Sequence, residues 1–228
     1  MKKFLIILLT LSSLLYAQTI PVIINNKEYK GEKVKNYIFV PEAKLLLYQE
    51  EIFELKKLDN MYIAENLGIL YDGKNIFEIY TSGDLILCPE KNILIRGDKK
   101  YSVKNFENIY FSILNYNYDF TGIRLFAYGI YPKMRYVLLE LAIFNLDKVP
   151  VKLDQKMFLL RVGNKDYYPD PSISAYFATQ GEEVLFNRLI QPKEGIIAYL
   201  IYDVPGTPEL LRIDPYYGLK KALEIKLP

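Results

Sequence analysis

The stretch YVLLELAIFN at residues 136–145 decides the fold class of this chain, together with IIAYLIYDVP at residues 196–205. Both runs are too apolar for surface loops and too interrupted for a membrane span, so each predicts a buried β-strand. We expect the two strands to form two buried walls of a β-sandwich. The segments between them then supply the connections that a sandwich needs.

The N-terminus has the pattern of a signal peptide. Lys2 and Lys3 form a short cationic region, residues 4–15 are mostly apolar, and Ala17 provides the small residue at a cleavage site. We expect export to the periplasm or cell surface with cleavage after Ala17; the alternative is an uncleaved anchor. A lipoprotein is not expected, because the one cysteine, Cys88, lies far from the cleavage point. No later stretch approaches the length of a membrane span, so none is expected in the mature chain.

Composition argues against several classes of function. The full chain carries 29 Lys and Arg against 27 Asp and Glu, and removal of residues 1–17 takes away Lys2 and Lys3, which leaves the charges balanced. Nucleic-acid binding draws on an excess of basic residues, so it is not expected. The chain has no histidine, which removes the usual acid–base residue and a common metal ligand. We therefore expect no enzyme and no cofactor.

Two short features have simple structural explanations. Cys88 has apolar neighbours, which favours a buried thiol over a crosslink between two chains. The tripeptide at residues 96–98 is Arg-Gly-Asp, an adhesion sequence, but Gly-Asp between two predicted strands is more typical of a hairpin turn.

The chain is expected to be mainly β, with a smaller β-rich domain before an immunoglobulin-like sandwich and one helix at most. The predicted divisions are residues 1–17, the signal peptide; 18–104, the β-rich domain; 105–118, a linker or boundary; and 119–228, the sandwich. No repeat of fixed period is evident. Residues 41–60 fit a helix, with apolar residues on one face, and fit a hairpin of residues 45–48 with 52–55 almost as well; the helix is slightly favoured.

The C-terminal half resembles the DUF4352 family. One strand closes on Asn145, a Gly-x-x-x-Tyr element begins at Gly163, a turn runs over residues 192–195, and the last long strand ends in Val204-Pro205. The resemblance covers about residues 119–227 and implies an exported immunoglobulin-like sandwich, related in fold to the mycobacterial antigen MPT63. It implies a binding or interaction role and no catalytic residues.

A second resemblance lies at the N-terminus. The segments INNKE at residues 24–28 and YIFVP at residues 37–41 resemble copper amine oxidase N-terminal-like domains of cell-surface proteins, over about residues 20–100. Those domains carry no copper site, so the resemblance implies nothing catalytic.

Candidate binding residues lie in connections of the sandwich. The connection over residues 169–182 is long for a compact domain, and long loops are often functional. Aromatic residues in or beside it, and in a second turn, are the candidates for a contact with a partner protein: Tyr167, Tyr168, Tyr176, Phe177, Tyr216 and Tyr217.

Three carboxylates, Asp166, Asp170 and Asp214, are candidate calcium ligands, because they lie next to turns and carboxylate oxygens are the ligands calcium prefers. The predicted function is a non-enzymatic binding or assembly protein of the bacterial cell envelope that acts through contacts with a protein partner. The alternatives are a calcium- or carbohydrate-binding module and, less favoured, a glycan hydrolase that needs only a carboxylate pair.

Overall fold

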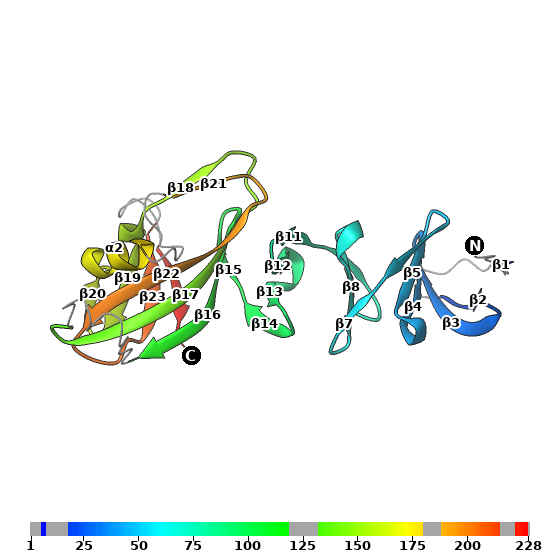
Figure 1. The fold of residues 1–228 in the computed structure, drawn as a ribbon, viewed down its shortest axis with the longest axis horizontal. Helices are drawn as coiled ribbons and strands as arrows, with labels where there is room; N and C mark the ends of the chain where they lie inside the picture. Colours follow the sequence, from blue (N-terminus) through cyan, green and yellow to red (C-terminus); the bar gives the residue numbers. More distant parts are fainter. Residues whose placement is uncertain (1–5, 8–17, 119–131, 180–187, 215–221, 228) are drawn as a thin grey trace. The chain divides into compact units, whose positions relative to one another are not determined.

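A computed structural model describes residues 6–7, 18–118, 132–179, 188–214 and 222–227 of the chain (Figure 1). These residues are mainly β, their strands pair antiparallel, and this part of the chain contains one short α-helix. The predicted fold class is therefore confirmed. The chain divides into two compact units, residues 1–80 with 88–91 and residues 81–87 with 92–228.

Three small antiparallel sheets make up the first half of the described chain. The first contains β1 (Ile6–Ile7), β2 (Gln18–Ile24), β3 (Lys27–Val34), β4 (Tyr37–Val40), β5 (Leu45–Tyr48) and β6 (Glu51–Glu54). The second contains β7 (Lys56–Leu58), β8 (Met61–Ala64), β9 (Ile69–Tyr71) and β10 (Ile76–Glu78). The third contains β11 (Tyr80–Ser82), β12 (Leu85–Cys88), β13 (Ile93–Arg96) and β14 (Lys99–Ser102).

These sheets are built from a repeat of 24 residues. In each one a strand leads into a short 3-10 helix and a second strand follows, and the helices η1 (Pro41–Ala43), η2 (Glu65–Leu67) and η3 (Pro89–Lys91) begin 24 residues apart. The residue after each helix, Lys44, Gly68 or Asn92, has a positive φ of 52°, 64° or 52°. Its carbonyl accepts a hydrogen bond from the backbone N–H eleven positions later, at 2.8, 2.9 and 3.0 Å.

The same period governs turns and burial. A second left-handed position recurs at Lys35, Asp59, Gly83 and Glu107, each between two strands. The buried positions at the ends of the strands before the helices recur at the same spacing. They are Phe39, Ile63 and Leu87, followed by Val40, Ala64 and Cys88.

The prediction that no repeat of fixed period exists is therefore wrong. The repeats share backbone conformation and residue class rather than identity: the position after the helix is lysine, glycine or asparagine, and the buried position that ends the preceding strand is valine, alanine or cysteine. A repeat of this kind is visible only when turn positions and apolar positions are aligned together.

Residues 41–60 form a hairpin rather than the slightly favoured helix. After η1, β5 pairs with β6 in the register Leu46↔Phe53 and Leu47↔Ile52, close to the alternative hairpin predicted from the sequence. Leu46 and Phe53 pack in a cluster with Phe39 and Tyr71, whose rings stack with centroids 3.9 Å apart. This packing between the first two sheets favours strands over the helical periodicity.

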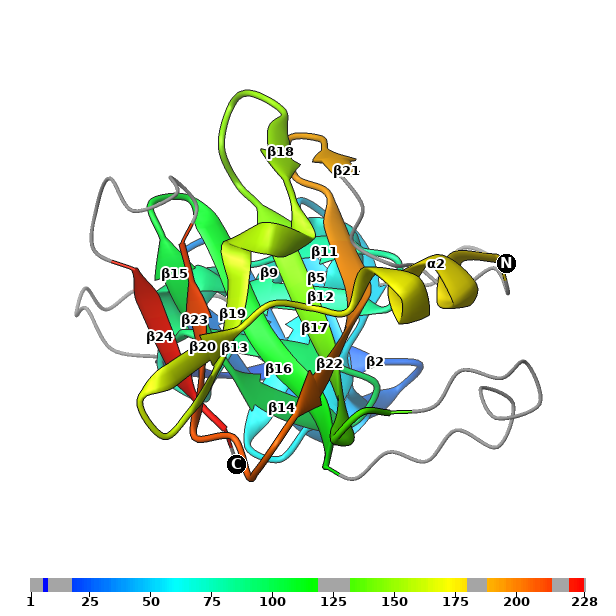
Figure 2. The ribbon, with the colours of Figure 1, turned by 90° about the vertical axis from the view of Figure 1, so that its left-hand side faces the viewer.

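The second half of the described chain is a two-layer sandwich (Figure 2). One sheet has the order β15 (Lys104–Phe106), β16 (Ile109–Tyr118), β17 (Arg135–Asn145) and β22 (Gly195–Val204). The other has the order β20 (Lys165–Tyr167), β19 (Phe158–Val162), β23 (Leu210–Ile213) and β24 (Leu223–Lys226). The remaining elements are a ribbon of β18 (Val151–Leu153) and β21 (Arg188–Ile190), the 3-10 helix η4 (Gln155–Met157) and the helix α2 (Pro171–Thr179).

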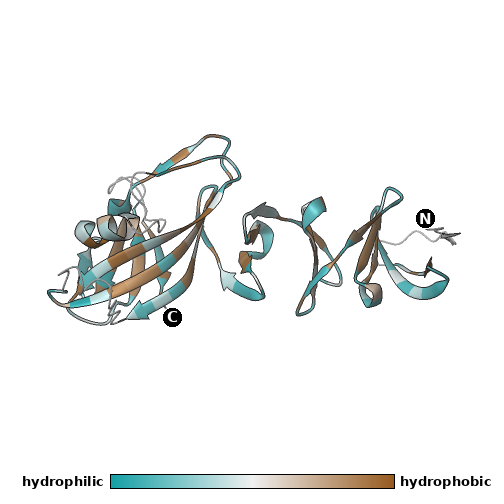
Figure 3. Ribbon diagram, in the orientation of Figure 1, coloured by the Kyte–Doolittle hydropathy of each residue, from teal (hydrophilic) through white to brown (hydrophobic). Residues whose placement is uncertain are grey.

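The two apolar stretches of the sequence are β17 and β22, and they are neighbours in one sheet. Leu139 lies opposite Leu200 in the register. The prediction of two separate walls is corrected: the pair forms a single wall, and its buried side chains face the second sheet. Figure 3 shows the apolar residues concentrated along these strands. Both stretches are continuously apolar at several positions because parts of their outer face are also covered, as described below.

The predicted linker over residues 105–118 is also corrected. Residues 104–118 form β15 and β16, which belong to the sandwich sheet, and Phe111 lies in its core. The turn between β15 and β16 has the positive φ at Glu107 that recurs every 24 residues, so the repeat pattern continues into the first strands of the sandwich. The polar residues that suggested a linker are exposed side chains of β15, of β16 and of the turn between them.

Candidate groove on the outer face of the sandwich sheet

The outer face of the β15–β16–β17–β22 sheet is covered at two places. Helix α2 covers one, where Ile173 packs against Tyr136 and Ile201. The third repeat approaches the other, where the Ser112 hydroxyl donates a hydrogen bond to the Ser102 carbonyl at 2.8 Å. Strand β22 thus has an outer face that is buried near its C-terminal end and accessible in the middle.

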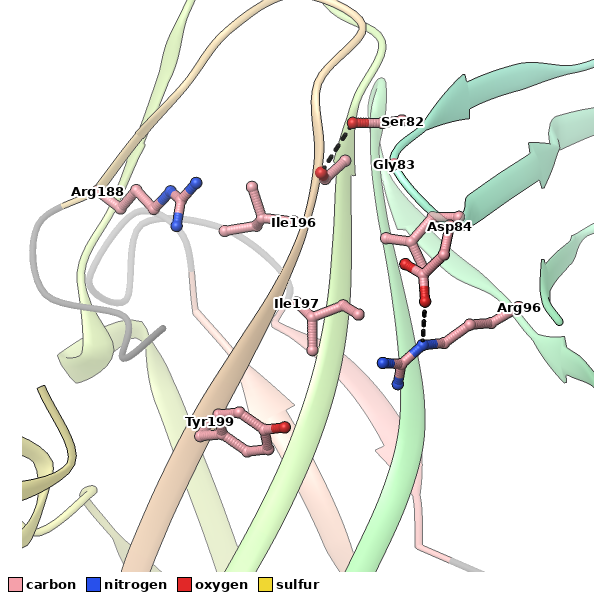
Figure 4. A pocket seen from close by; sticks show the side chains of 10 residues that line it. Ser82, Gly83, Asp84, Arg96, Arg188, Ile196, Ile197 and Tyr199 are labelled. Carbon is pink, nitrogen blue, oxygen red and sulfur yellow. Dashed lines mark hydrogen bonds and ion pairs between the residues drawn. The ribbon is translucent and has the colours of Figure 1, made fainter. Parts of the chain in front are cut away.

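A groove of about 450 Å³ lies beside β22 (Figure 4). Its wall is the turn between β11 and β12 with the end of β13, and its floor is the outer side of β22. Within that wall the Ser82 hydroxyl donates to the Gly195 carbonyl at 3.0 Å. The lining residues used below are Ser82, Asp84, Arg96, Arg188, Ile197 and Tyr199.

Arg96 organises the polar side of the groove. Its Nε donates to Asp84 Oδ2 at 2.7 Å and its Nη1 donates to Glu140 Oε1 at 2.6 Å. Hydrogen bonding to Asp84, and secondarily to Glu140, raises the pKa of Arg96 further above its usual value, although burial acts in the opposite direction. The guanidinium is therefore a fixed cation held between two carboxylates, with further N–H donors remaining.

The third repeat departs from the other copies at the groove. Ser82 occupies a position that is apolar in the other copies: Val34, Leu58 and Phe106. Asp84 occupies a position that is asparagine in the others: Asn36, Asn60 and Asn108. Arg96 stands where the first two repeats have Tyr48 and Asp72. All three departures line the groove, and each makes a hydrogen bond there.

A row of polar side chains crosses the sheet next to this wall. In the register of the sheet Asn115 lies opposite Glu140, and Glu140 lies opposite Tyr199. Side chains at directly opposed positions lie on the same face, with Cβ atoms about 5 Å apart. The row therefore places an amide, a carboxylate and a phenol side by side on the outer face.

The candidate aromatic residues are not gathered in one loop. Residues 171–179 form α2, which corrects the prediction of a long irregular connection over 169–182. The Asp170 side chain accepts hydrogen bonds from the N–H groups of Ser172 and Ile173 at 2.8 and 3.2 Å, which caps the helix.

The positions of these aromatic residues differ. Tyr167 is half-buried against the sandwich core, and Tyr176 packs on the cluster under α2. Tyr168 is 60% exposed. The side chain of Phe177 and both Tyr216 and Tyr217 lie outside the part of the chain that the structure describes.

The candidate calcium ligands have structural partners. Asp166 accepts hydrogen bonds from Arg161, and its second oxygen lies 3.0 Å from Arg161 Nη2 and 3.4 Å from Arg212 Nη1. Asp170 caps α2, and the backbone N–H of Asp214 donates to the Met157 carbonyl at 2.7 Å. Within the described ranges no group of three or more acidic, cysteine or histidine residues could hold a metal ion.

The remaining predictions concern Cys88, the turn at residues 96–98, the signal peptide and membrane spans. The Cys88 thiol is buried, as expected, and burial raises its pKa. Residues 96–98 turn between β13 and β14 with Gly97 at a φ of 59°, so the hairpin interpretation is confirmed. The signal-peptide residues lie outside the described ranges apart from Ile6 and Ile7. In the described part of the chain, no helix is long and apolar enough to cross a membrane.

The groove residues Arg96 and Asp84, and Glu140 that binds Arg96, were not predicted from the sequence. Their signal is visible only after the repeats are aligned, because Asp84 is an ordinary turn residue until its counterparts are seen to be asparagine.

Comparison with known proteins adds little. No family model matches the chain, and no curated protein matches it. Among solved structures, it is similar to a Bacillus subtilis protein described as a lipoprotein (ycdA), with 19% identity and a TM-score of 0.42, over 57% of this chain and 39% of that one. The chain thus spans about two fifths of that protein's length, and a likeness this low carries no functional argument.

Proposed function

We propose that this chain is an exported, non-enzymatic binding protein of the bacterial cell envelope, which holds a protein partner. The observation that carries the proposal is the 24-residue repeat, found in three successive sheets. In repeat arrays each unit contacts its neighbours to form a core, and the exposed positions are left to vary for binding. The composition of residues 1–17 supports export, and the pattern closing on Asn145 supports a DUF4352-like sandwich.

Exposed acidic residues offer a direct test on the repeats. Glu54 and Glu78 occupy equivalent positions, and both are exposed. The tagged chain is used to capture proteins from an envelope extract, beside a Glu54→Lys, Glu78→Lys double variant. A Glu224→Lys variant, altered at an exposed position of β24, is the control for charge reversal alone.

We expect one protein to be captured by the unaltered chain and by the control, and to be reduced about tenfold with the double variant. A Tyr168→Ser variant is tested beside them. Loss of capture with this variant alone would place the partner contact on the sandwich and contradict a contact on the repeats. Equal capture by all variants, or no captured protein, would contradict a protein partner held by these surfaces.

A further inference from the structure

We propose that the groove beside β22 is a binding site for a neutral oligosaccharide. The inference does not rest on the proposed function, since it concerns a different surface and a different class of ligand. Its starting point is the juxtaposition of Arg96 and Asp84 from the third repeat with Glu140 and Tyr199 from the sandwich sheet.

The two guanidinium groups at the groove are paired with three carboxylates, so these side chains together carry one excess negative charge. Arg96 is paired with Asp84 and Glu140, and Arg188 lies 3.4 Å from Glu194. The excess carboxylate would repel an anionic ligand, and a ligand of either charge would compete with the existing pairs. An uncharged ligand leaves the ion pairs intact, which favours a neutral molecule.

The remaining hydrogen-bonding groups suit hydroxyl groups. The second oxygen of Asp84 can accept, and the Arg96 guanidinium can donate, within a network that the ion pair with Glu140 helps to fix. A sugar hydroxyl both donates and accepts, so adjacent hydroxyls can bridge a carboxylate and a guanidinium that lie together. Because the network is already held in place, little side-chain freedom is lost on binding.

The apolar part of the floor suits the C–H face of a sugar ring. Ile197 and Tyr199 follow each other on the outer side of β22, and both are partly exposed. Figure 4 shows Tyr199 beside β17, on the same side of the sheet as the Arg96 guanidinium. A volume of about 450 Å³ is within the range of roughly 300–1,000 Å³ that is usual for small-ligand sites.

The departures from the repeat give an independent argument. The other copies have an apolar residue at the position of Ser82 and asparagine at that of Asp84, whereas the third copy has serine and aspartate there. Positions that break a local rule are expected at functional sites. Here the substitutions supply the polar wall of the groove.

The test uses titration calorimetry with the purified full chain and four probes of four units each: chitotetraose, cellotetraose, tetragalacturonic acid and the smaller peptide tetraalanine. Three variants accompany it. Tyr199→Ala removes the ring, Arg96→Gln removes the charge, and Tyr168→Ala removes an exposed tyrosine outside the groove. Thermal unfolding of each variant shows whether it is folded.

We expect one of the neutral tetrasaccharides to bind, with affinity reduced about tenfold by Tyr199→Ala and unchanged by Tyr168→Ala. Arg96→Gln should weaken binding as well; if it fails to fold, the Tyr199→Ala result decides alone. The proposal is overturned if neither neutral sugar binds, if Tyr199→Ala binds as well as the unaltered chain, or if the acidic sugar or the peptide binds in their place.

Discussion

Asn145 shows how one residue can determine where a strand ends. Its side chain is fully buried, its Nδ2 donates to the carbonyls of Val149 and Ile190 at 3.0 Å each, and its Oδ1 accepts from the Asp147 N–H at 2.8 Å. Asn145 therefore joins the two connections that lead into the β18–β21 ribbon, and the side chain has a partner on each of its polar atoms.

Replacing Asn145 by leucine should destabilise the chain strongly. The two carbonyls and the N–H would lose their partners in a largely buried place, at a cost of about 2–4 kcal/mol in the free energy of unfolding. Urea unfolding measures the change. Asn117→Leu, at an exposed position of β16, is the control and should stay within about 0.5 kcal/mol of the unaltered chain. A cost at Asn145 as small as that of the control would contradict this role.

Asp166 should make stability depend on pH on the acid side. Hydrogen bonding from Arg161 lowers the pKa of Asp166, with Arg212 adding to the effect and burial opposing it. A carboxyl whose pKa is lowered on folding stabilises the native state above its unfolded pKa of about 3.9, and this contribution is lost as the pH falls through the lower folded value.

The corresponding variant is Asp166→Asn. Its midpoint of thermal unfolding should lie below that of the unaltered chain at neutral pH, and the gap should close as the pH falls below about 4. A gap that is the same at pH 3 and pH 7 would show that Asp166 acts through something other than its charge.

At the scale of the element, the turn after each 3-10 helix demands a left-handed residue. Gly68 adopts this conformation with a φ of 64°, whereas Lys44 adopts it at 52° with a side chain present. The left-handed conformation costs a residue with a Cβ atom roughly 1–2 kcal/mol relative to glycine. The cost at Lys44 is offset by the hydrogen bond that its carbonyl accepts from Leu55.

This geometry gives opposite expectations at equivalent positions. Gly68→Ala should destabilise by about 1 kcal/mol, and Lys44→Gly should stabilise by up to about 1 kcal/mol. Lys57→Gly, at an exposed position of β7, should destabilise by about 0.5–1 kcal/mol because the strand needs no glycine there. Chemical denaturation measures the free energy of unfolding of the three variants. A stabilising effect of Gly68→Ala would contradict a left-handed conformation at this position.

The elements differed in how far they could be predicted from the sequence. The strands β17 and β22 and the hairpin turn at Gly97 follow from apolar runs and turn residues, which are local signals. The pairing of β17 with β22 in one sheet does not follow from the sequence. Neighbours in one sheet and strands in two facing sheets would bury the same side chains. The hairpin over residues 45–54 was the less favoured of two predictions, because packing between sheets outweighs the local helical periodicity. Helix α2 was predicted as a loop, although Asp170 caps its first turn.

The candidate site could be predicted even less. The groove needs residues from β13, β17 and β22, which are far apart in the sequence, and its clearest signal is a departure from a repeat. The tyrosines and aspartates chosen from their loops were plausible in type, but Asp166 and Asp170 already have partners within the fold.

At the scale of the whole molecule, the repeat predicts which deletions the chain tolerates. Removing residues 59–82 takes out one period and joins Leu58 to Gly83, so one turn of the repeat replaces its equivalent. We expect this variant to unfold cooperatively, with an m-value smaller by about a tenth, in line with its length. Urea unfolding followed by circular dichroism measures both.

A deletion of half a period is the matched comparison. Removing residues 59–70 joins β7 directly to the last residue of β9, so the turn, β8, the 3-10 helix and most of β9 are lost while their partner β10 remains. This variant should lose cooperative unfolding. Equal behaviour of the two deletions would show that the 24-residue period is not a unit of folding.

The buried thiol of Cys88 can be used to detect opening of the third repeat. The thiol sits at the position occupied by Val40 and Ala64 in the other repeats, it is fully buried, and the described chain has no other cysteine. A thiol reagent can therefore reach it only when the third repeat opens. The rate of thiol modification in native buffer gives the rate of this opening. Comparison with the rate in urea shows whether the repeat opens by local unfolding or only when the whole protein unfolds.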